Sequence, residues 1–252
     1  MVAFKDHFSS IAAQYAQFRP RYPRELFEYL ASLVPVRDLA WDCACGNGQA
    51  TLPLAAAFER VLGTDASAAQ INAAAPHPRV QYRVAPAEQC GLADGGVDLI
   101  TVAQALHWFD VERFYAEADR VLKPGGALAV WTYGGLRMPD AVLDELLLQF
   151  NRDVVGPYWP PERRLVDEGY RSLPFPYVEL EPPSFHMQQE WALPRLLGYV
   201  RSWSATRGFA AHHGTDPVLE LARKLQAPWG NPAEERRIIW PLSLRVGLKT
   251  SA

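Results

Sequence analysis

The chain has few cysteines, little net charge and no long hydrophobic run. Its 3 cysteines are an odd number in 252 residues, which argues against a framework of disulfide bonds. No second pair of cysteines or histidines stands at zinc spacing, so we expect no metal site. A formal net charge of −3 gives no electrostatic reason to expect binding to nucleic acid or to an anionic membrane.

Membrane-spanning and targeting segments are also missing from the pattern. No stretch approaches the ~20 apolar residues that cross a bilayer. Residues 1–10 lack the apolar core of a signal peptide. Together with the scarce cysteines, these absences favour a cytoplasmic protein that does not contact membranes. The length of 252 residues suits one large α/β domain, or a core with a small cap.

What the first half does contain is a regular alternation of strands and helices. Five segments have the length and apolar character of strands, at 38–42, 60–65, 80–84, 97–103 and 127–133. Helical spacing of apolar residues fills the segments before and between them, at 23–34, 49–58, 67–75 and 111–122. Ser67 and Asp110 are candidate N-caps. This order predicts an α/β fold of the Rossmann-like kind, a doubly wound sheet with helices on both faces.

The pattern changes after Gly134-Gly135. A helix at 139–153 precedes a region rich in proline and tryptophan, where three helical stretches are expected between Pro161 and Leu225. Residues 178–187 and 238–248 read as two closing strands, the second with a proline that favours an edge or a bulge. We therefore predict one domain in four parts: a lid and first helix at 1–37, a cofactor-binding core at 38–134, an aromatic-rich helical cap with one strand at 135–235, and a closing strand at 236–252.

The segment Asp42–Gly48 carries most of the functional information. It joins the end of the first predicted strand to a turn with two glycines, Gly46 and Gly48. Asp65 ends the second strand, 23 positions after Asp42. A glycine turn followed by an acid in this order is typical of proteins that hold a nucleoside at the carboxyl edge of a parallel sheet.

Two residues select among nucleoside cofactors. The dinucleotide fingerprint places a third glycine where this chain has Thr51, and the charge of Asp42 would repel a pyrophosphate. The same charge suits the ammonium group of S-adenosylmethionine, which has no phosphate. Backbone amides of Gly46 to Gly48 could meet the carboxylate of that cofactor. Asp65 could accept the ribose hydroxyls of either cofactor.

The ordered motifs resemble the class I S-adenosylmethionine-dependent methyltransferases, and within them the type-11 subgroup that includes trans-aconitate methyltransferase-like proteins. The resemblance implies a seven-stranded sheet with the last strand antiparallel. Besides the turn and Asp65, it is carried by Ala85–Glu88, Val97–Thr101 and Arg120–Gly126, and for the subgroup by Phe18–Pro23, Ala105–Asp110, Arg201–Ser204 and Trp240–Leu242.

The resemblance also implies cofactor contacts. Ala87 and Glu88 would face adenine, and Tyr22 would bound the methionine end. Gln104 would touch the cofactor or instead satisfy a loop carbonyl. Ala44 stands where the usual turn has glycine, so we expect an ordinary backbone conformation there, because alanine does not reach positive φ easily.

A small-molecule methyl acceptor, with a carboxylate or another oxygen as the receiving group, is the expected substrate. His107 is the candidate catalytic residue, as a general base or a hydrogen-bonding group, unless it is a structural histidine bonded to backbone. Arg19, Trp108 and Trp203 are candidate substrate contacts. Two other functions stay open: an NAD-dependent oxidoreductase, and a non-catalytic binding or regulatory protein with this fold.

Overall fold

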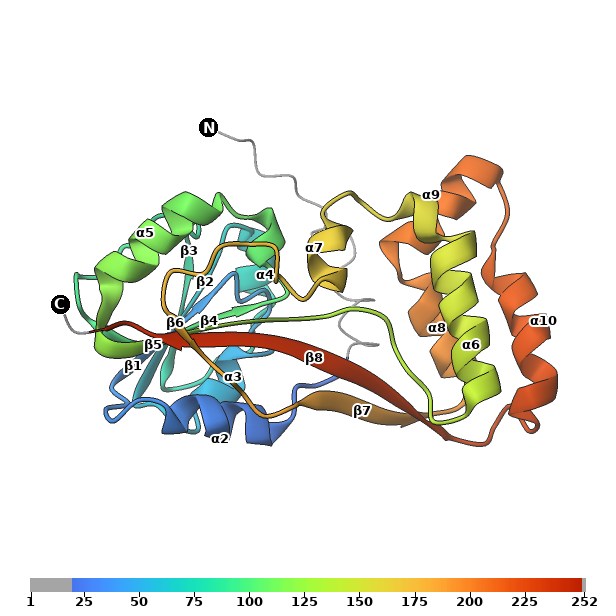
Figure 1. Ribbon diagram of the computed structural model, residues 1–252, viewed down its shortest axis with the longest axis horizontal. Coiled ribbons are helices and arrows are strands. Elements are labelled where there is room, and N and C mark those ends of the chain that lie inside the picture. The colour runs from blue at the N-terminus through green and yellow to red at the C-terminus, as the bar shows by residue number, and fades with distance from the viewer. Residues whose placement is uncertain (1–19, 251–252) are drawn as a thin grey trace.

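The computed structural model describes residues 20–250, which are organised around a mixed sheet whose main path has seven strands (Figure 1). The strand order is β3-β2-β1-β4-β5-β8-β6. Strands β1 to β5 are mutually parallel, whereas β8 runs antiparallel to both β5 and β6. The expected sheet with an antiparallel closing strand is confirmed. Its strands are β1 (Leu39–Cys43), β2 (Arg60–Asp65), β3 (Val80–Val84), β4 (Val97–Ala103), β5 (Leu122–Tyr133), β6 (Val178–Leu180) and β8 (Arg236–Leu248).

Helices cover both faces of this sheet, as the doubly wound prediction requires. The helix α2 (Arg24–Ser32) packs through Leu26 and Leu30 into the core that also contains Trp131 of β5. On the other face, α5 (Val111–Val121) packs through Phe114 into a second core. Because both faces of the sheet are covered, the central strand β4 is buried from Val97 to Val102, including its polar residues Asp98 and Thr101.

Two short helices follow β1 and β2. The helix α3 (Thr51–Leu54) is shorter than the predicted 49–58, and α4 (Ala68–Asn72) is shorter than 67–75. Both end in tight bonds between residues three apart, such as Ala56 N to Pro53 O, which close a helix without extending it. The predicted N-caps are confirmed: Ser67 accepts the amide of Gln70, and Asp110 accepts that of Arg113.

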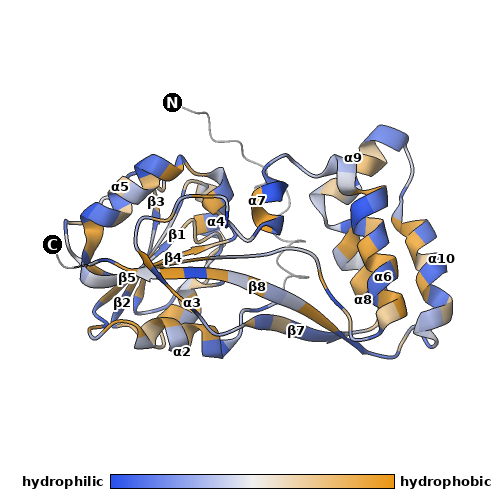
Figure 2. Cartoon of the chain, viewed as in Figure 1, coloured by the Kyte–Doolittle hydropathy of each residue, from blue (hydrophilic) through white to orange (hydrophobic). Residues whose placement is uncertain are grey.

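The second half forms a helical cap at the far end of the molecule (Figure 1). Four helices lie between residues 161 and 230 where three were expected. Figure 2 shows hydrophobic and hydrophilic residues on the same cap helices, which fits helices with one buried face. The cap helices are α6 (Ala141–Gln149), which continues in a π turn over Phe150–Val154, then the short 3₁₀ turn Gly156–Tyr158, α7 (Arg163–Asp167), α8 (Leu193–Arg201), α9 (Ser204–His213) and α10 (Val218–Trp229).

A long two-stranded ribbon joins the sheet to the cap. The single strand expected at 178–187 is in fact two, β6 and β7 (His186–Trp191), because Pro182 and Pro183 between them have no N–H for a ladder. The first part of β8 pairs with β7 up to Pro241, and the rest pairs with β5 from Leu242 onward. Pro241 thus stands where the strand changes partners, in keeping with its expected edge or bulge position.

The helix α7 lies apart from the other cap helices, between them and the sheet (Figure 1). It contacts β5 and the short 3₁₀ turn η1 (Leu106–Trp108), which directly follows β4. A segment of the cap region therefore covers the carboxyl edge of the sheet. No helix within residues 20–250 is long and apolar enough to cross a bilayer.

Candidate active site

In the turn after β1, every second residue from Ala44 to Gly48 has a left-handed backbone conformation. Ala44 has a φ of 55°, Gly46 of 55° and Gly48 of 91°. The expectation of an ordinary conformation at Ala44 is therefore wrong. The amide of Cys45 donates to the carbonyl of Thr64 on β2 at 2.8 Å, which holds the chain in a sharp reversal at Ala44. An alanine in this region costs roughly 1–2 kcal/mol, which the surrounding contacts must offset.

The Tyr82 side chain crosses the turn and leaves no space for a Cβ at Gly48. A Cβ at Gly48 would stand 2.3 Å from the Tyr82 hydroxyl oxygen, and one at Gly63 would stand 2.9 Å from the Tyr82 ring. Tyr82 of β3 therefore lies across two glycines. The nearest neighbour of a Cβ at Gly46 is the Gln70 amide oxygen at 3.7 Å, so space remains beside that residue.

Asp42 is fully buried at the end of β1. Its carboxylate accepts hydrogen bonds from Thr51 Oγ1 at 2.6 Å and from Thr101 Oγ1 at 2.9 Å. Within residues 20–250 no lysine, arginine or histidine forms an ion pair with it. Burial raises the pKa of Asp42 to about 6, and the two threonine hydroxyls oppose that rise. Among the residues that the structure describes, the buried acid at this sheet edge thus has no cationic partner.

Replacing Asp42 with asparagine is expected to stabilise the ligand-free protein more at pH 8 than at pH 4, by about 2–3 kcal/mol. The pKa in the folded state lies above the ordinary 3.8. The stability associated with protonated Asp42 is therefore full below about pH 4 and is lost as the pH rises through 6. Urea unfolding of both proteins across this range measures the difference, and a difference that does not change with pH would contradict the assignment.

Asp65 binds the backbone of the turn. Its Oδ2 accepts the amide of Gly46 at 2.9 Å, and its Oδ1 accepts that of Ser67 at 2.8 Å. The amide of Gly48 donates to Cys45 O. The backbone amides of Gly46, Asn47 and Gly48 are expected to meet a ligand carboxylate. Those of Gly46 and Gly48 already donate within the protein, so the amide of Asn47 is the one left for the ligand. Asp65 keeps a partly exposed position at the end of β2.

The loop after β3 brings Glu88 and Ala87 near the segment that follows β4. The Glu88 carboxylate accepts the amide of Asp110 at 3.2 Å. Ala87 is half-buried against the core beneath α5. The loop is thus anchored at the N-terminus of α5, and contact of either residue with adenine stays a prediction.

Gln104 is bound into the sheet edge. It has a φ of 58°, its side-chain amide donates to Tyr133 O at 2.9 Å, and Thr132 Oγ1 donates to its Oε1. This arrangement corresponds to the alternative in which Gln104 satisfies a loop carbonyl. A direct contact with the cofactor stays a prediction.

The N-terminal segment reaches the turn. Gln49 Nε2 donates to the carbonyl of Pro20 at 2.8 Å. Tyr22 is 9% exposed and packs edge to face on Trp131 of β5, with the ring centroids 5.4 Å apart. Arg19 lies outside the described residues, so its substrate contact stays a prediction.

His107 is held by a residue that the sequence did not indicate. Its Nδ1 lies 2.8 Å from the hydroxyl of Tyr170, which follows α7 and is fully buried. Burial lowers the pKa of His107 to about 4, so the imidazole is neutral at pH 7. No motif marks Tyr170, because it lies 63 positions away from His107 in the chain.

The two tryptophans expected to contact substrate differ in exposure. Trp108 lies beside His107, with ring centroids 4.7 Å apart, and is 36% exposed. Trp203 is 8% exposed and packs against Trp159 and Phe150 inside the cap. Trp108 is thus placed as a pocket wall would be, whereas Trp203 packs in the cap core. A substrate contact of either residue stays a prediction.

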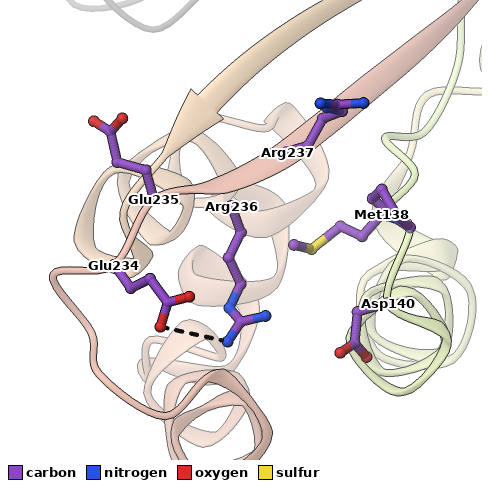
Figure 3. A pocket seen from close by; sticks show the side chains of 7 residues that line it. Met138, Asp140, Glu234, Glu235, Arg236 and Arg237 are labelled. Atoms are coloured by element: carbon purple, nitrogen blue, oxygen red, sulfur yellow. Dashed lines mark ion pairs between the residues drawn. The ribbon is translucent and has the colours of Figure 1, made fainter.

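A cavity of about 230 Å³ lies elsewhere, where the cap meets the start of β8. Figure 3 shows Met138 and Asp140 on one side and Glu234 to Arg237 on the other, with an ion pair of 3.7 Å between Glu234 and Arg236. None of the residues proposed for the cofactor lines it. It is a separate feature of the cap.

The strand order, the glycine turn after β1 and the acid at the end of β2 define a protein of the class I methyltransferase fold. A family model described as a methyltransferase domain matches residues 41–130. A putative methyltransferase of Dictyostelium discoideum is 34% identical over 225 residues, covering 88% of this chain and 86% of the relative. The solved structure of a putative type II methyltransferase from Anaeromyxobacter dehalogenans is 46% identical with a TM-score of 0.89, covering 93% of this chain and 100% of that one.

The chain therefore belongs to the class I S-adenosylmethionine-dependent methyltransferases. A probable S-adenosylmethionine-dependent methyltransferase of Saccharomyces cerevisiae is 27% identical, covering 82% of this chain and 84% of the relative. The class I resemblance is confirmed, and membership of the trans-aconitate-like subgroup stays a prediction. Membership of a methyltransferase family argues against the alternative that the chain is an NAD-dependent oxidoreductase.

Proposed function

We propose that this chain binds S-adenosylmethionine and transfers its methyl group to an oxygen, such as a carboxylate oxygen, of a small-molecule acceptor. The observation that carries the proposal is Asp42, a buried carboxylate that forms no ion pair within residues 20–250. A buried charge needs a partner. The methionyl ammonium would supply one, directly or through water, whereas a pyrophosphate would add repulsion.

The remaining cofactor contacts follow the order of the strands. Asp65 would accept the ribose hydroxyls while its carboxylate holds the turn. Ala87 and Glu88 would face adenine, and Asn47 would offer its amide to the cofactor carboxylate. The left-handed turn, including Ala44, would leave room for the ligand beside Gly46. Tyr22 and Gln104 would border the methionine end.

Once bound, the cofactor supplies a methyl group already activated by a positive sulfur, so the protein needs no covalent nucleophile. The work of the chain is to align the acceptor oxygen with the methyl carbon and to exclude water, which contributes ~7–11 kcal/mol in well-oriented reactions. Trp108 would form a wall of the acceptor site and His107 would hydrogen-bond the acceptor. The low pKa of His107 makes it a weak base at neutral pH, which suits an acceptor with no proton to lose.

Isothermal titration with S-adenosylmethionine and with NADH tests the proposal. We expect binding of the first and no binding of the second. Binding of NADH alone would refute it. A screen of small carboxylic acids and phenols with a methyl-labelled cofactor then tests turnover. Cofactor binding without turnover on any acceptor would favour the non-catalytic alternative.

A further inference from the structure

Tyr170 and His107 form a buried pair that is built from distant parts of the chain. Tyr170 follows α7 and His107 follows β4. The Tyr170 hydroxyl and His107 Nδ1 are 2.8 Å apart, and the two rings are nearly parallel, at an interplanar angle of 30°. Tyr170 is fully buried, whereas His107 is half-buried. His107 Nε2 forms no hydrogen bond within residues 20–250, so it is the ring nitrogen available to a ligand.

The chemistry of the two groups determines which partner donates. Burial raises the pKa of the Tyr170 hydroxyl, which therefore keeps its hydrogen at neutral pH. A phenol is a stronger hydrogen-bond donor than acceptor, and the unprotonated nitrogen of a neutral imidazole is a better acceptor than a hydroxyl oxygen. The Tyr170 hydroxyl therefore donates across the 2.8 Å contact to the lone pair of His107 Nδ1. A neutral imidazole that accepts at Nδ1 must carry its proton on Nε2.

The backbone of Tyr170 indicates that its side chain is needed there. It has a φ of 62°, directly after Gly169 at 61°, in a region that a bulky residue rarely adopts. Arg245 Nη1 donates to the Tyr170 carbonyl at 2.6 Å, and the Tyr170 amide donates to Leu165 O at 2.8 Å. The three non-glycine residues with positive φ in the described chain are Ala44, Gln104 and Tyr170, and all three lie around the carboxyl edge of the sheet. Strained residues cluster at functional sites.

We propose that Tyr170 is a positioning residue that holds neutral His107 in the tautomer with the proton on Nε2, so that His107 presents a hydrogen-bond donor at the carboxyl edge of β4.

The consequence for the reaction rests on the proposed function. An Nε2–H group can hold an acceptor oxygen in line with the methyl carbon, and it cannot remove a proton. A carboxylate fits this role. Its oxygen lone pair forms the new bond to the methyl carbon, the carbon–sulfur bond breaks with its electron pair left on sulfur, and the sulfonium and carboxylate charges both disappear. No proton is lost, so no base is required.

Nitrogen NMR of the protein labelled at its histidine rings tests the assignment. The chain has 6 histidines, and the signal lost in His107→Gln identifies His107. We expect the wild-type spectrum to show a protonated Nε2 and an unprotonated Nδ1 at pH 7. In Tyr170→Phe we expect a mixture of tautomers and a higher titration midpoint for His107, because the phenol no longer stabilises the neutral ring. Glu162 raises and Arg163 lowers the pKa of His107, and both are unchanged in the variant.

Tyr115→Phe is the matched control. Tyr115 is buried in the same core, and its hydroxyl donates to Pro174 O at 2.9 Å, so the variant loses a comparable bond away from His107. We expect its histidine spectrum to match the wild type. A proton on Nδ1 in the wild type overturns the proposal even if Tyr170→Phe does not fold. A lower midpoint in Tyr170→Phe overturns it too, since the oxygen would then have been the acceptor. The tautomer is measured without cofactor, so a failure of S-adenosylmethionine to bind would refute the proposed function and leave this assignment standing.

Discussion

Gly48→Ala is expected to lower the free energy of unfolding by about 2–5 kcal/mol. A φ of 91° places the residue in a region that costs an alanine roughly 1–2 kcal/mol. The new Cβ would also stand 2.3 Å from the Tyr82 hydroxyl oxygen, an overlap that must move a packed side chain at a cost of about 1–3 kcal/mol. Because Tyr82 spans β3, β2 and the turn, this displacement would also distort the proposed cofactor site, and we expect S-adenosylmethionine binding to be lost.

Gly95→Ala separates the two causes. Gly95 has a φ of 58°, and a Cβ there meets nothing within 4 Å, so this variant should lose only about 1–2 kcal/mol. The double variant Gly48→Ala with Tyr82→Phe removes the overlapping oxygen, which has no hydrogen-bond partner of normal geometry within residues 20–250. We expect it to recover part of the lost stability. Equal losses in Gly48→Ala and Gly95→Ala in urea unfolding would show that Tyr82 does not constrain the turn.

The parts of the fold that could be predicted are those set by local patterns. Short apolar runs indicate strands such as β4 and β5, and alternating apolar residues indicate β3, because the burial of a strand is visible in its own sequence. Ser67 and Asp110 identified two helix starts, since capping acts within one turn of the chain. The order of the glycine turn and Asp65 located the candidate site for the same reason: each motif is short and lies at the end of its own strand.

The contacts that could not be predicted join residues far apart in the chain. The Asp42 carboxylate is bonded to Thr101, 59 positions away, and His107 is bonded to Tyr170. The sequence shows Thr51 only as a break in the dinucleotide spacing, although its hydroxyl donates to Asp42. The preference of alanine predicts a negative φ at Ala44, whereas the hydrogen bond from the Cys45 amide to Thr64 O on β2 overrides that preference. A conformational propensity describes a single residue, whereas these hydrogen bonds and the conformation of Ala44 depend on several residues that only the fold brings together.

Asp65→Ala is expected to weaken S-adenosylmethionine binding by at least about 100-fold. Hydrogen bonds to a charged group contribute about 1.5–3 kcal/mol each, and Asp65 would make them to both ribose hydroxyls. The same carboxylate holds the Gly46 amide at 2.9 Å and the Ser67 amide at 2.8 Å. The loss therefore has two sources, contact with the ligand and the shape of the turn, and affinity alone does not divide them.

A ligand that lacks the ribose hydroxyls separates these two contributions to the loss of affinity. S-adenosylhomocysteine and its 2′,3′-dideoxy form are titrated into wild type, Asp65→Asn and Asp94→Asn, the last altering an exposed acid paired with Arg120. If Asp65 binds ribose, wild type and Asp94→Asn prefer the hydroxylated ligand, and Asp65→Asn loses that preference. If Asp65 only shapes the turn, both ligands weaken equally in Asp65→Asn and the preference survives. Because the amides of Gly46 and Ser67 fix the carboxylate at the strand end, its orientation is set before any ligand arrives, so we expect the loss of preference.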